Sequence, residues 1–360
     1  MIEQTRQSKT RAPSLVKVRN LTKKFPVAAG VFRSATHFIH AVDDISFDVG
    51  MGEVLGLIGE SGCGKTTTGK LLVKLEPPTT GQILIKNTHI DAKLSKAQPI
   101  HKQNMKLLDT DDFADIAHLR GKNLKLFRRN VQMIFQDPYE SLNPRMTIYD
   151  ICAEPLSVQN IGSIVEREAR VAELLALVGL TPPETFLFRY PHELSGGQRQ
   201  RIAIARAMIL NPSFIVADEL TSILDVSIRT GVMNLMLELR EKFNISFLYI
   251  THDLAVARYM CNRIAVMYLG KIVEMGATEE IIQNPQHPYT KALISAVPIP
   301  DPSIRRETLE LKGGVTKPIN PAPRCRFFER CPLATPRCES SDHPPLVEKS
   351  NGHKVACYEV

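Results

Sequence analysis

The sequence has no long apolar run: none of its 360 residues lies in a stretch that approaches the roughly eighteen apolar positions of a membrane-spanning helix. Residues 1–14 are polar and basic without an apolar centre, so we expect a flexible tail and no secretory signal. The chain also lacks internal repeats and blocks of like charge, and its net charge of +7 comes from interspersed residues. These absences argue against a membrane-spanning chain, a secreted protein and a nucleic-acid partner.

The composition that remains is that of an ordinary globular protein, with 43% hydrophobic and 23% charged residues. Short apolar strand patterns alternate with helical ones, which predicts an α/β fold with a mostly parallel sheet and a site at the carboxyl ends of its strands. Residues 27–40 are interpreted as a loop insertion in a hairpin, and residues 91–125 as a loosely structured insertion with a short helix. Residues 148–179 and 185–190 have helical periodicity.

A phosphate-binding loop is the first motif with chemistry. Residues 59–66 read GESGCGKT, after a buried-strand pattern at residues 54–58 and before a helical pattern at residues 66–75. Backbone N–H groups of such a loop wrap phosphates, Lys65 supplies a cation and Thr66 offers a hydroxyl to Mg²⁺. The residues expected to contact nucleotide here are Gly59, Glu60, Ser61, Gly62, Cys63, Gly64, Lys65, Thr66 and Thr67.

Three strand patterns further along the chain end in polar side chains. Gln136 follows the first, Asp218 and Glu219 end the second, and His252 follows the third. Glu219 is placed to polarise an attacking water, and His252 to hold the γ-phosphate in line. The predicted catalytic residues are Glu219, His252, Gln136 and Lys65, and the predicted Mg²⁺ ligands are Thr66, Gln136 and Asp218.

The octapeptide LSGGQRQR at residues 194–201 is the most specific stretch of the chain. Its first five residues match by chance on the order of once in a million positions. The motif lies between the phosphate loop and Asp218, in the order expected of an ATPase whose two facing chains share each triphosphate. A polar, Gly-rich turn that caps the helix from Gln198 onward is a compatible structural interpretation.

Taken in this order, the motifs resemble the nucleotide-binding subunits of ABC transporters over about residues 15–280. The resemblance implies a P-loop NTPase (RecA-like) core with an antiparallel β subdomain and a helical subdomain at about residues 137–200, with ATP and Mg²⁺ as ligands. It also implies that Phe25 stacks on adenine and that Asp225 and Ser222 lie at the dimer seam. Leu220 and Ile223 depart from the family's usual proline and alanine. The residues that would bind the γ-phosphate held by the partner are Ser195, Gly196, Gly197 and Gln198.

Three further stretches, residues 136–148, 284–293 and 296–302, resemble the ATPases of oligopeptide and dipeptide importers, closest to the second (F-type) subunit. We therefore expect an ABC ATPase domain at residues 15–283, a Pro-rich linker at residues 284–302 and a small Cys-rich C-terminal domain at residues 303–360. Residues 139–148 would receive the coupling helix of a permease.

This resemblance implies a set of partners at the cytoplasmic face of the cell membrane. They are a sister ATPase that completes a heterodimer, two membrane permeases and an extracytoplasmic peptide-binding protein. Two other functions stay open: an importer of nickel or another small solute from the same subfamily, and a regulatory ATPase that responds to redox state or iron.

Four cysteines near the C-terminus form the last candidate site. Disulfides are disfavoured in the cytosol, and the spacings exceed those of zinc knuckles, whereas four thiolates suit a [4Fe–4S] cluster of structural role. The resemblance implies the same cluster; zinc and reduced thiols remain alternatives. Cys63, Cys152 and Cys261 are interpreted as packing residues. The predicted cluster ligands are Cys325, Cys331, Cys338 and Cys357.

Overall fold

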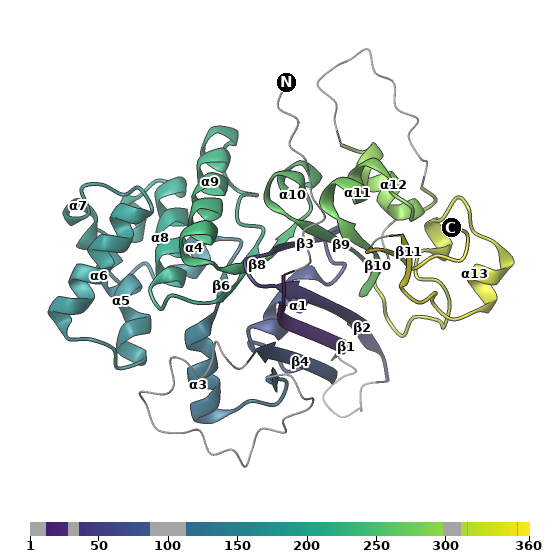
Figure 1. The fold of residues 1–360 in the computed structure, drawn as a ribbon, viewed down its shortest axis with the longest axis horizontal. Coiled ribbons are helices and arrows are strands. Elements are labelled where there is room, and N and C mark those ends of the chain that lie inside the picture. The colour runs from purple at the N-terminus through teal and green to yellow at the C-terminus, as the bar shows by residue number, and fades with distance from the viewer. Residues whose placement is uncertain (1–11, 28–35, 87–112, 298–310, 315, 351) are drawn as a thin grey trace.

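The computed structural model describes residues 12–27, 36–86, 113–297, 311–314, 316–350 and 352–360. Residues 1–11 of the tail predicted at residues 1–14, and residues 91–112 of the insertion predicted at residues 91–125, lie outside these ranges, whereas Ser14 already begins a strand. Within them the chain forms two sheets, an arm of helices at one end and a C-terminal segment at the other (Figure 1).

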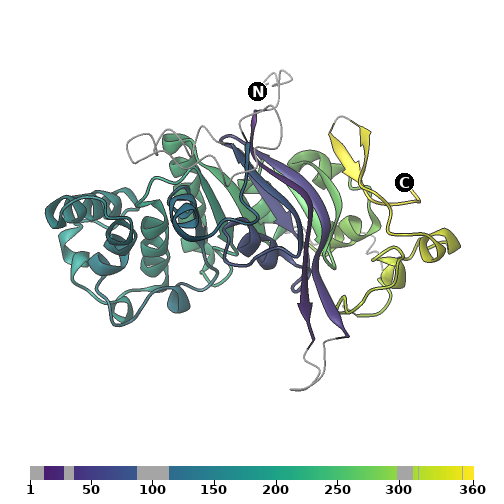
Figure 2. The same ribbon diagram turned by 90° about the horizontal axis from the view of Figure 1, so that it is seen from below.

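The smaller sheet is antiparallel, in the order β2-β1-β4-β5. Its strands β1 (Ser14–Pro26) and β2 (Phe38–Gly50) form a long hairpin beside the larger sheet (Figure 2). Strand β4 (Thr80–Lys86) pairs with β1, and β5 (Phe113–Asp115) pairs with β4. The expected antiparallel subdomain is therefore present, with one strand, β5, inside the segment expected to be loosely structured.

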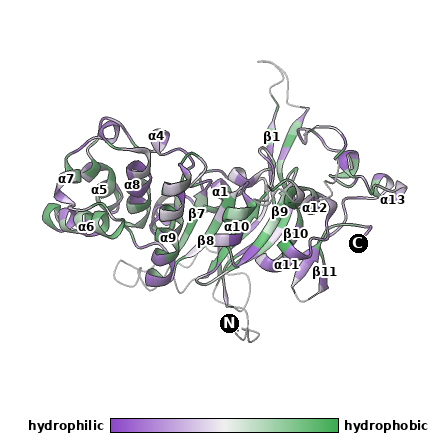
Figure 3. Cartoon of the chain, turned by 90° about the horizontal axis from the view of Figure 1, so that it is seen from above, coloured by the Kyte–Doolittle hydropathy of each residue, from purple (hydrophilic) through white to green (hydrophobic). Residues whose placement is uncertain are grey.

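The larger sheet has the order β11-β12-β10-β9-β3-β8-β7-β6. Its parallel part consists of β9 (Arg263–Tyr268), β3 (Val54–Ile58), β8 (Ser246–Thr251), β7 (Phe214–Asp218) and β6 (Val131–Ile134). Strands β3, β7 and β8 are buried along their whole length, as expected of parallel strands covered on both faces. In Figure 3 the hydrophobic colour is concentrated in the middle of the molecule, on strands that include β7 and β8.

Three antiparallel strands extend this sheet, so it is mixed. Strand β10 (Lys271–Ala277) pairs with β9, β12 (His353–Val355) pairs with β10, and β11 (Val347–Ser350) pairs with β12. The end of the chain therefore completes a sheet that begins at residue 54.

Helices cover the large sheet: α1 (Lys65–Leu72), α3 (Gly121–Asn130), α9 (Val226–Phe243), α10 (Leu254–Met260) and α11 (Thr278–Gln283). The arm contains α4 (Pro138–Ser141), α5 (Ile148–Val158), α6 (Ile164–Leu177), α7 (Glu184–Leu187) and α8 (Gly196–Met208). The helical stretch expected at residues 148–179 is thus two helices, because α6 begins anew at its own cap, Ser163. Among the described residues, no helix has the length and apolar character needed to span a bilayer.

The linker expected at residues 284–302 contains a helix, α12 (Pro288–Ser295), which corrects that interpretation. Tyr289 on this helix is fully buried and its ring lies 4.7 Å from that of Tyr268 on β9. Pro288 occupies the first turn, where a missing N–H costs the helix nothing, and the His287 ring accepts a hydrogen bond from the Tyr289 N–H. A short helix α13 (Pro336–Ser340) follows in the C-terminal segment.

Candidate nucleotide-binding site

The phosphate loop opens onto a cavity of about 230 Å³ at the carboxyl ends of β3 and β7. The loop, the first turn of α1 and strand β2 supply most of its walls. The lining residues are Ile39, Ala41, Ser61, Gly62, Gly64, Lys65, Thr66, Thr67, Gln136 and Glu219.

Glycines allow the loop to pack tightly against neighbouring backbone. A Cβ at Gly59 would lie 2.2 Å from the carbonyl oxygen of Met267, and one at Gly64 would lie 2.1 Å from that of Ala41. Gly64 also has φ of 110°, a conformation that disfavours other residues, and it is the N-cap of α1. The loop therefore ends at a helix N-terminus whose N–H groups favour a phosphate.

Lys65 is buried, and its amine lies over the loop itself. Its Nζ donates to the carbonyl oxygens of Gly59 at 2.7 Å and Glu60 at 2.9 Å. Burial raises the pKa of the neighbouring Cys63 thiol. A neutral, buried thiol is consistent with the packing role expected of Cys63.

Asp218 and Thr66 form a group of oxygen ligands at the end of β7. The Thr66 hydroxyl donates to Asp218 Oδ1 at 3.2 Å, and burial raises the pKa of the Asp218 carboxyl. A buried carboxylate beside a hydroxyl suits a hard cation, so the two residues fit Mg²⁺. Gln136, the third predicted Mg²⁺ ligand, lines the same cavity. Its amide donates to Glu219 Oε2 at 3.0 Å, so its hydrogen bond joins it to Glu219 and not to Asp218.

Glu219 lies between Gln136 and His252. Its second carboxylate oxygen is 3.2 Å from His252 Nδ1, and its N–H donates to the carbonyl of Ile250 on β8 at 2.9 Å. The backbone φ of Glu219 is 45°, which non-glycine residues seldom adopt outside functional sites and turns. Gln136, Glu219 and His252 thus come from adjacent strand ends, and Lys65 begins α1 at the same edge of the sheet.

The signature residues do not line this cavity. Ser195 caps α8: its hydroxyl accepts from the Gln198 N–H at 3.3 Å, and the Gln198 side chain accepts from the Ser195 N–H at 3.0 Å. The helix begins at Gly196, two residues before the predicted start. A Cβ on Gly197 would lie 2.7 Å from the Ile228 side chain. One chain therefore presents the signature apart from its own phosphate loop.

The seam residues lie on the loop after β7. Asp225 is the exposed N-cap of α9, and the Ser222 hydroxyl donates to the Glu219 carbonyl at 2.9 Å. Ile223, one of the two departures, is 53% exposed, whereas Leu220 is buried.

Phe25 is outside the cavity lining, although it pairs across the hairpin with Ile39, which does line it. Its ring lies 4.8 Å from Lys23 Nζ. Ile39 and Ala41 on β2 are site residues that sequence analysis missed. Ile39 falls within residues 27–40, which were interpreted as a loop insertion, whereas β2 begins at Phe38. The alternating strand pattern that begins at residue 41 signals Ala41 but not Ile39.

The four C-terminal cysteines lie in one small region without a metal site. The N–H of Cys325 donates to the Cys338 carbonyl at 3.0 Å. Burial, together with the neighbouring thiols of Cys338, Cys357 and Cys331, raises the pKa of the Cys325 thiol to about 12. Over the part of the chain that the structure describes, no group of three or more His, Cys, Asp or Glu side chains could hold a metal ion. As placed, these residues do not fit the expected cluster.

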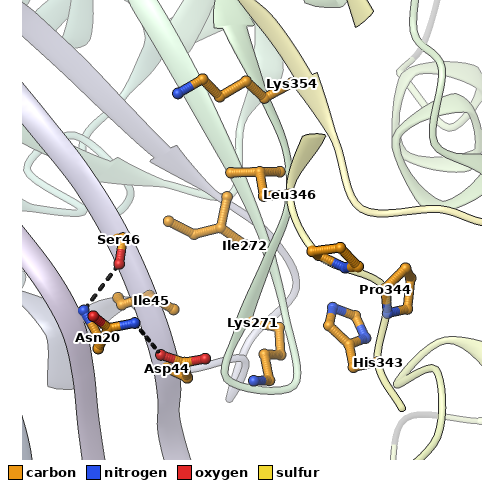
Figure 4. Close-up of a pocket in the computed structure, with 11 residues that line it drawn as sticks. Asn20, Asp44, Ile45, Ser46, Lys271, Ile272, His343, Pro344, Leu346 and Lys354 are labelled. Atoms are coloured by element: carbon orange, nitrogen blue, oxygen red, sulfur yellow. Dashed lines mark hydrogen bonds between the residues drawn. The ribbon is translucent and has the colours of Figure 1, made fainter. Parts of the chain in front are cut away.

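A cavity of about 380 Å³ lies elsewhere, between the β1–β2 hairpin, β10 and residues 343–346 (Figure 4). Its walls mix Lys271 and Lys354 with Ile272 and Leu346, and Asn20 donates to Asp44 at 2.8 Å beside it. None of the predicted catalytic residues lines it. The phosphate-loop cavity is smaller, but its lining includes the predicted catalytic residues Lys65, Gln136 and Glu219.

A glycine-rich loop at a helix N-terminus, with Asp218, Glu219 and His252 at adjacent strand ends, defines a P-loop ATPase. A family model described as ABC transporter matches residues 42–222, and the chain belongs to this family of ATPases. A second model, described as Oligopeptide/dipeptide transporter, C-terminal region, matches residues 273–338.

Two relatives can be aligned with this chain over nearly its whole length. The Oligopeptide transport ATP-binding protein AppF of Bacillus subtilis is 45% identical over 96% of this chain and 97% of its own. The Dipeptide transport ATP-binding protein DppF of Haemophilus influenzae is 40% identical over 99% of each. A solved ATP-binding cassette, a dimeric post-hydrolysis state bound to ADP and Pi, has a TM-score of 0.59 and 29% identity, covering 73% of this chain and 99% of that one.

Proposed function

We propose that this chain hydrolyses ATP to energise the import of oligopeptides or dipeptides through a membrane ABC transporter. The observation that carries the proposal is the presence, in one chain, of the ATPase cavity and of a C-terminal region like that of oligopeptide/dipeptide transporters. The names of the relatives in Bacillus subtilis and Haemophilus influenzae support the same substrate class.

In this proposal each side chain of the site has a separate role in ATP binding or hydrolysis. Lys65 moves from the loop carbonyls to the outer phosphates, while Asp218 and Thr66 hold Mg²⁺, which offsets phosphate charge when bound. Glu219 polarises the attacking water, and His252 and Gln136 hold its carboxylate in place. Ser195, Gly196, Gly197 and Gln198 serve the triphosphate of a sister ATPase.

The transport cycle follows from this division. ATP binding closes the dimer and turns two permeases outward to an extracytoplasmic peptide-binding protein, and hydrolysis resets them. Phe25 holds adenine, Asp225 and Ser222 couple the two sites, and the chain binds the permeases at the cytoplasmic face of the membrane through residues 139–148.

The experiment reconstitutes the chain in vesicles with the sister ATPase, permeases and binding protein that we expect to be encoded beside its gene. We expect ATP hydrolysis to rise when both a peptide and the binding protein are added, and labelled peptide to accumulate. Nickel is the matched alternative solute. Stimulation by nickel and not by peptide, or a response to thiol oxidation alone, would contradict the proposal.

For the four cysteines we propose a [4Fe–4S] site that braces the C-terminal segment. Four thiols within one small, partly buried region support it, but the placed side chains must reorient to bind a cluster. Iron and acid-labile sulfide are measured in the chain purified without oxygen, with Cys331→Ser as the control. Bound zinc without iron would show a zinc site instead of the cluster, and the absence of both metals would show reduced thiols.

A further inference from the structure

The C-terminal segment reaches the phosphate loop through residues 325–331. Phe327 is buried, with its ring 5.1 Å from that of Tyr268 and 5.5 Å from that of Tyr289. This ring cluster anchors the short helical turn Phe328–Arg330 against β9 and α12. Arg330 is therefore held beside the loop by a packed aromatic core.

The guanidinium of Arg330 grips the Glu60 carboxylate in the phosphate loop. Nη1 donates to Oε2 at 2.7 Å and Nη2 to Oε1 at 3.0 Å, a two-pronged geometry that is stronger than a single bond. Arg330 is 8% exposed, and the bond to Glu60 raises the pKa of its guanidinium.

Besides a turn bond from the Cys63 N–H to its carbonyl at 3.3 Å, Glu60 is held by three side chains. Its N–H donates to the Tyr289 hydroxyl at 2.9 Å, its carbonyl accepts from Lys65, and its carboxylate accepts from Arg330. Two of these three partners lie outside the ATPase motifs, in α12 and the cysteine segment.

The pair also matters for charge. Glu60 places a carboxylate in a loop that binds an anion, and a free negative charge there would repel a triphosphate. Arg330 offsets that charge. Among the hydrogen bonds and ion pairs of the described residues, its side chain alone contacts the Glu60 carboxylate.

We propose that Arg330 is a positioning residue for ATP: it neutralises Glu60 and holds the phosphate loop open to the triphosphate. Through Arg330, the C-terminal segment thereby sets the ATP affinity of a phosphate loop that lies about 270 residues earlier in the sequence. This inference rests on the proposed nucleotide site.

The test measures Mg·ATP affinity by calorimetric titration of the full-length chain. Arg330→Gln is expected to weaken binding about fivefold or more, because Glu60 is left uncompensated. Glu60→Gln is expected to bind at least as tightly as the wild type, and Glu60→Gln/Arg330→Gln to return within about twofold of it, since the repelling charge is gone. Arg330→Lys keeps the charge without the fork and should fall between.

Arg324→Gln is the matched control, because Arg324 lies in the same segment but pairs with Glu329 and Glu339 at 2.6 and 3.6 Å. A purely structural Arg330 would lower thermal stability in the single and double variants alike without restoring affinity in the double, which would overturn the inference. Unchanged affinity in Arg330→Gln would overturn it too. If Arg330→Gln does not fold, the Glu60→Gln and Arg330→Lys affinities decide. Failure of the wild type to bind ATP would instead contradict the proposed function.

Discussion

At the residue scale, the chemistry depends on a few side chains held by unusual backbone. Glu219 combines a positive φ with contacts to Gln136 and His252 on either side of its carboxylate. This arrangement aims one carboxylate into the cavity and leaves it little freedom to turn away. Its neighbour Asp218 points to Thr66 instead, so two adjacent acids have separate partners.

Glu219→Gln tests the assignment of the base. We expect hydrolysis to fall by roughly a hundredfold or more while Mg·ATP still binds, because the amide cannot accept the proton of water. Phosphate release and ATP binding are measured on the same sample. Glu241→Gln, at an exposed side chain that pairs with Arg240, should leave both unchanged. Wild-type turnover in Glu219→Gln would show that another group activates the water.

Asp218 makes a pH-dependent prediction about stability. Burial raises its pKa in the folded chain, so the folded state holds a proton that the unfolded chain has lost, and stability falls as pH rises from the unfolded towards the folded pKa. Asp218→Asn should therefore melt about 1–2 °C higher than the wild type near neutral pH without nucleotide. Below the unfolded pKa this difference should vanish. The same variant should lose Mg²⁺-dependent ATP binding.

At the scale of elements, helix caps carry both structure and function. Ser195 caps α8 through a reciprocal pair with Gln198, and Ser163 caps α6 in the same way with Glu166. The two helices differ in that only α8 begins with the signature motif. This pairing offers a way to separate the stability of a helix from its role in ATP binding.

Ser195→Ala should lower the free energy of unfolding by about 1 kcal/mol, because a cap is lost. Ser195→Asp should keep the cap and the stability but abolish ATP-dependent dimer formation with the sister ATPase, since a carboxylate would face the γ-phosphate that the sister ATPase holds. Ser163→Ala, remote from the signature, should match the stability loss of Ser195→Ala without affecting dimers. Melting and light scattering measure both quantities. Normal dimer formation by Ser195→Asp would remove Ser195 from the shared site.

Elements with strong local patterns were predictable, and those stabilised from a distance were not. Strands β3, β7 and β8 are short apolar runs because both their faces are covered, so sequence alone marks them. Helix α12 was missed because two prolines resemble a linker, although one of them starts the helix. The grip of Arg330 on Glu60 has no local signal at all, because only the folded sheet brings β10 and the C-terminal segment beside the loop.

At the scale of the whole molecule, the nucleotide cavity lies between the helical arm and the C-terminal segment. The helical arm presents the signature and an exposed Tyr139, while the C-terminal segment supports the phosphate loop from behind. Under the proposed function, one chain would therefore contribute half of each of two ATP sites, and its phosphate loop would be completed by the signature of a second chain.

Trapping the closed dimer identifies that second chain. With Mg·ATP, Glu219→Gln alone should remain a monomer in light scattering, but should form a stable dimer with the sister ATPase, because hydrolysis can no longer reopen the shared sites. Residues exposed on the seam loop, such as Ile223 and Asp225, would become buried there. Adding Lys65→Ala to Glu219→Gln should weaken this dimer, since one triphosphate loses its cation. A stable ATP-dependent dimer of Glu219→Gln with itself would show that the partner is a second copy of this chain.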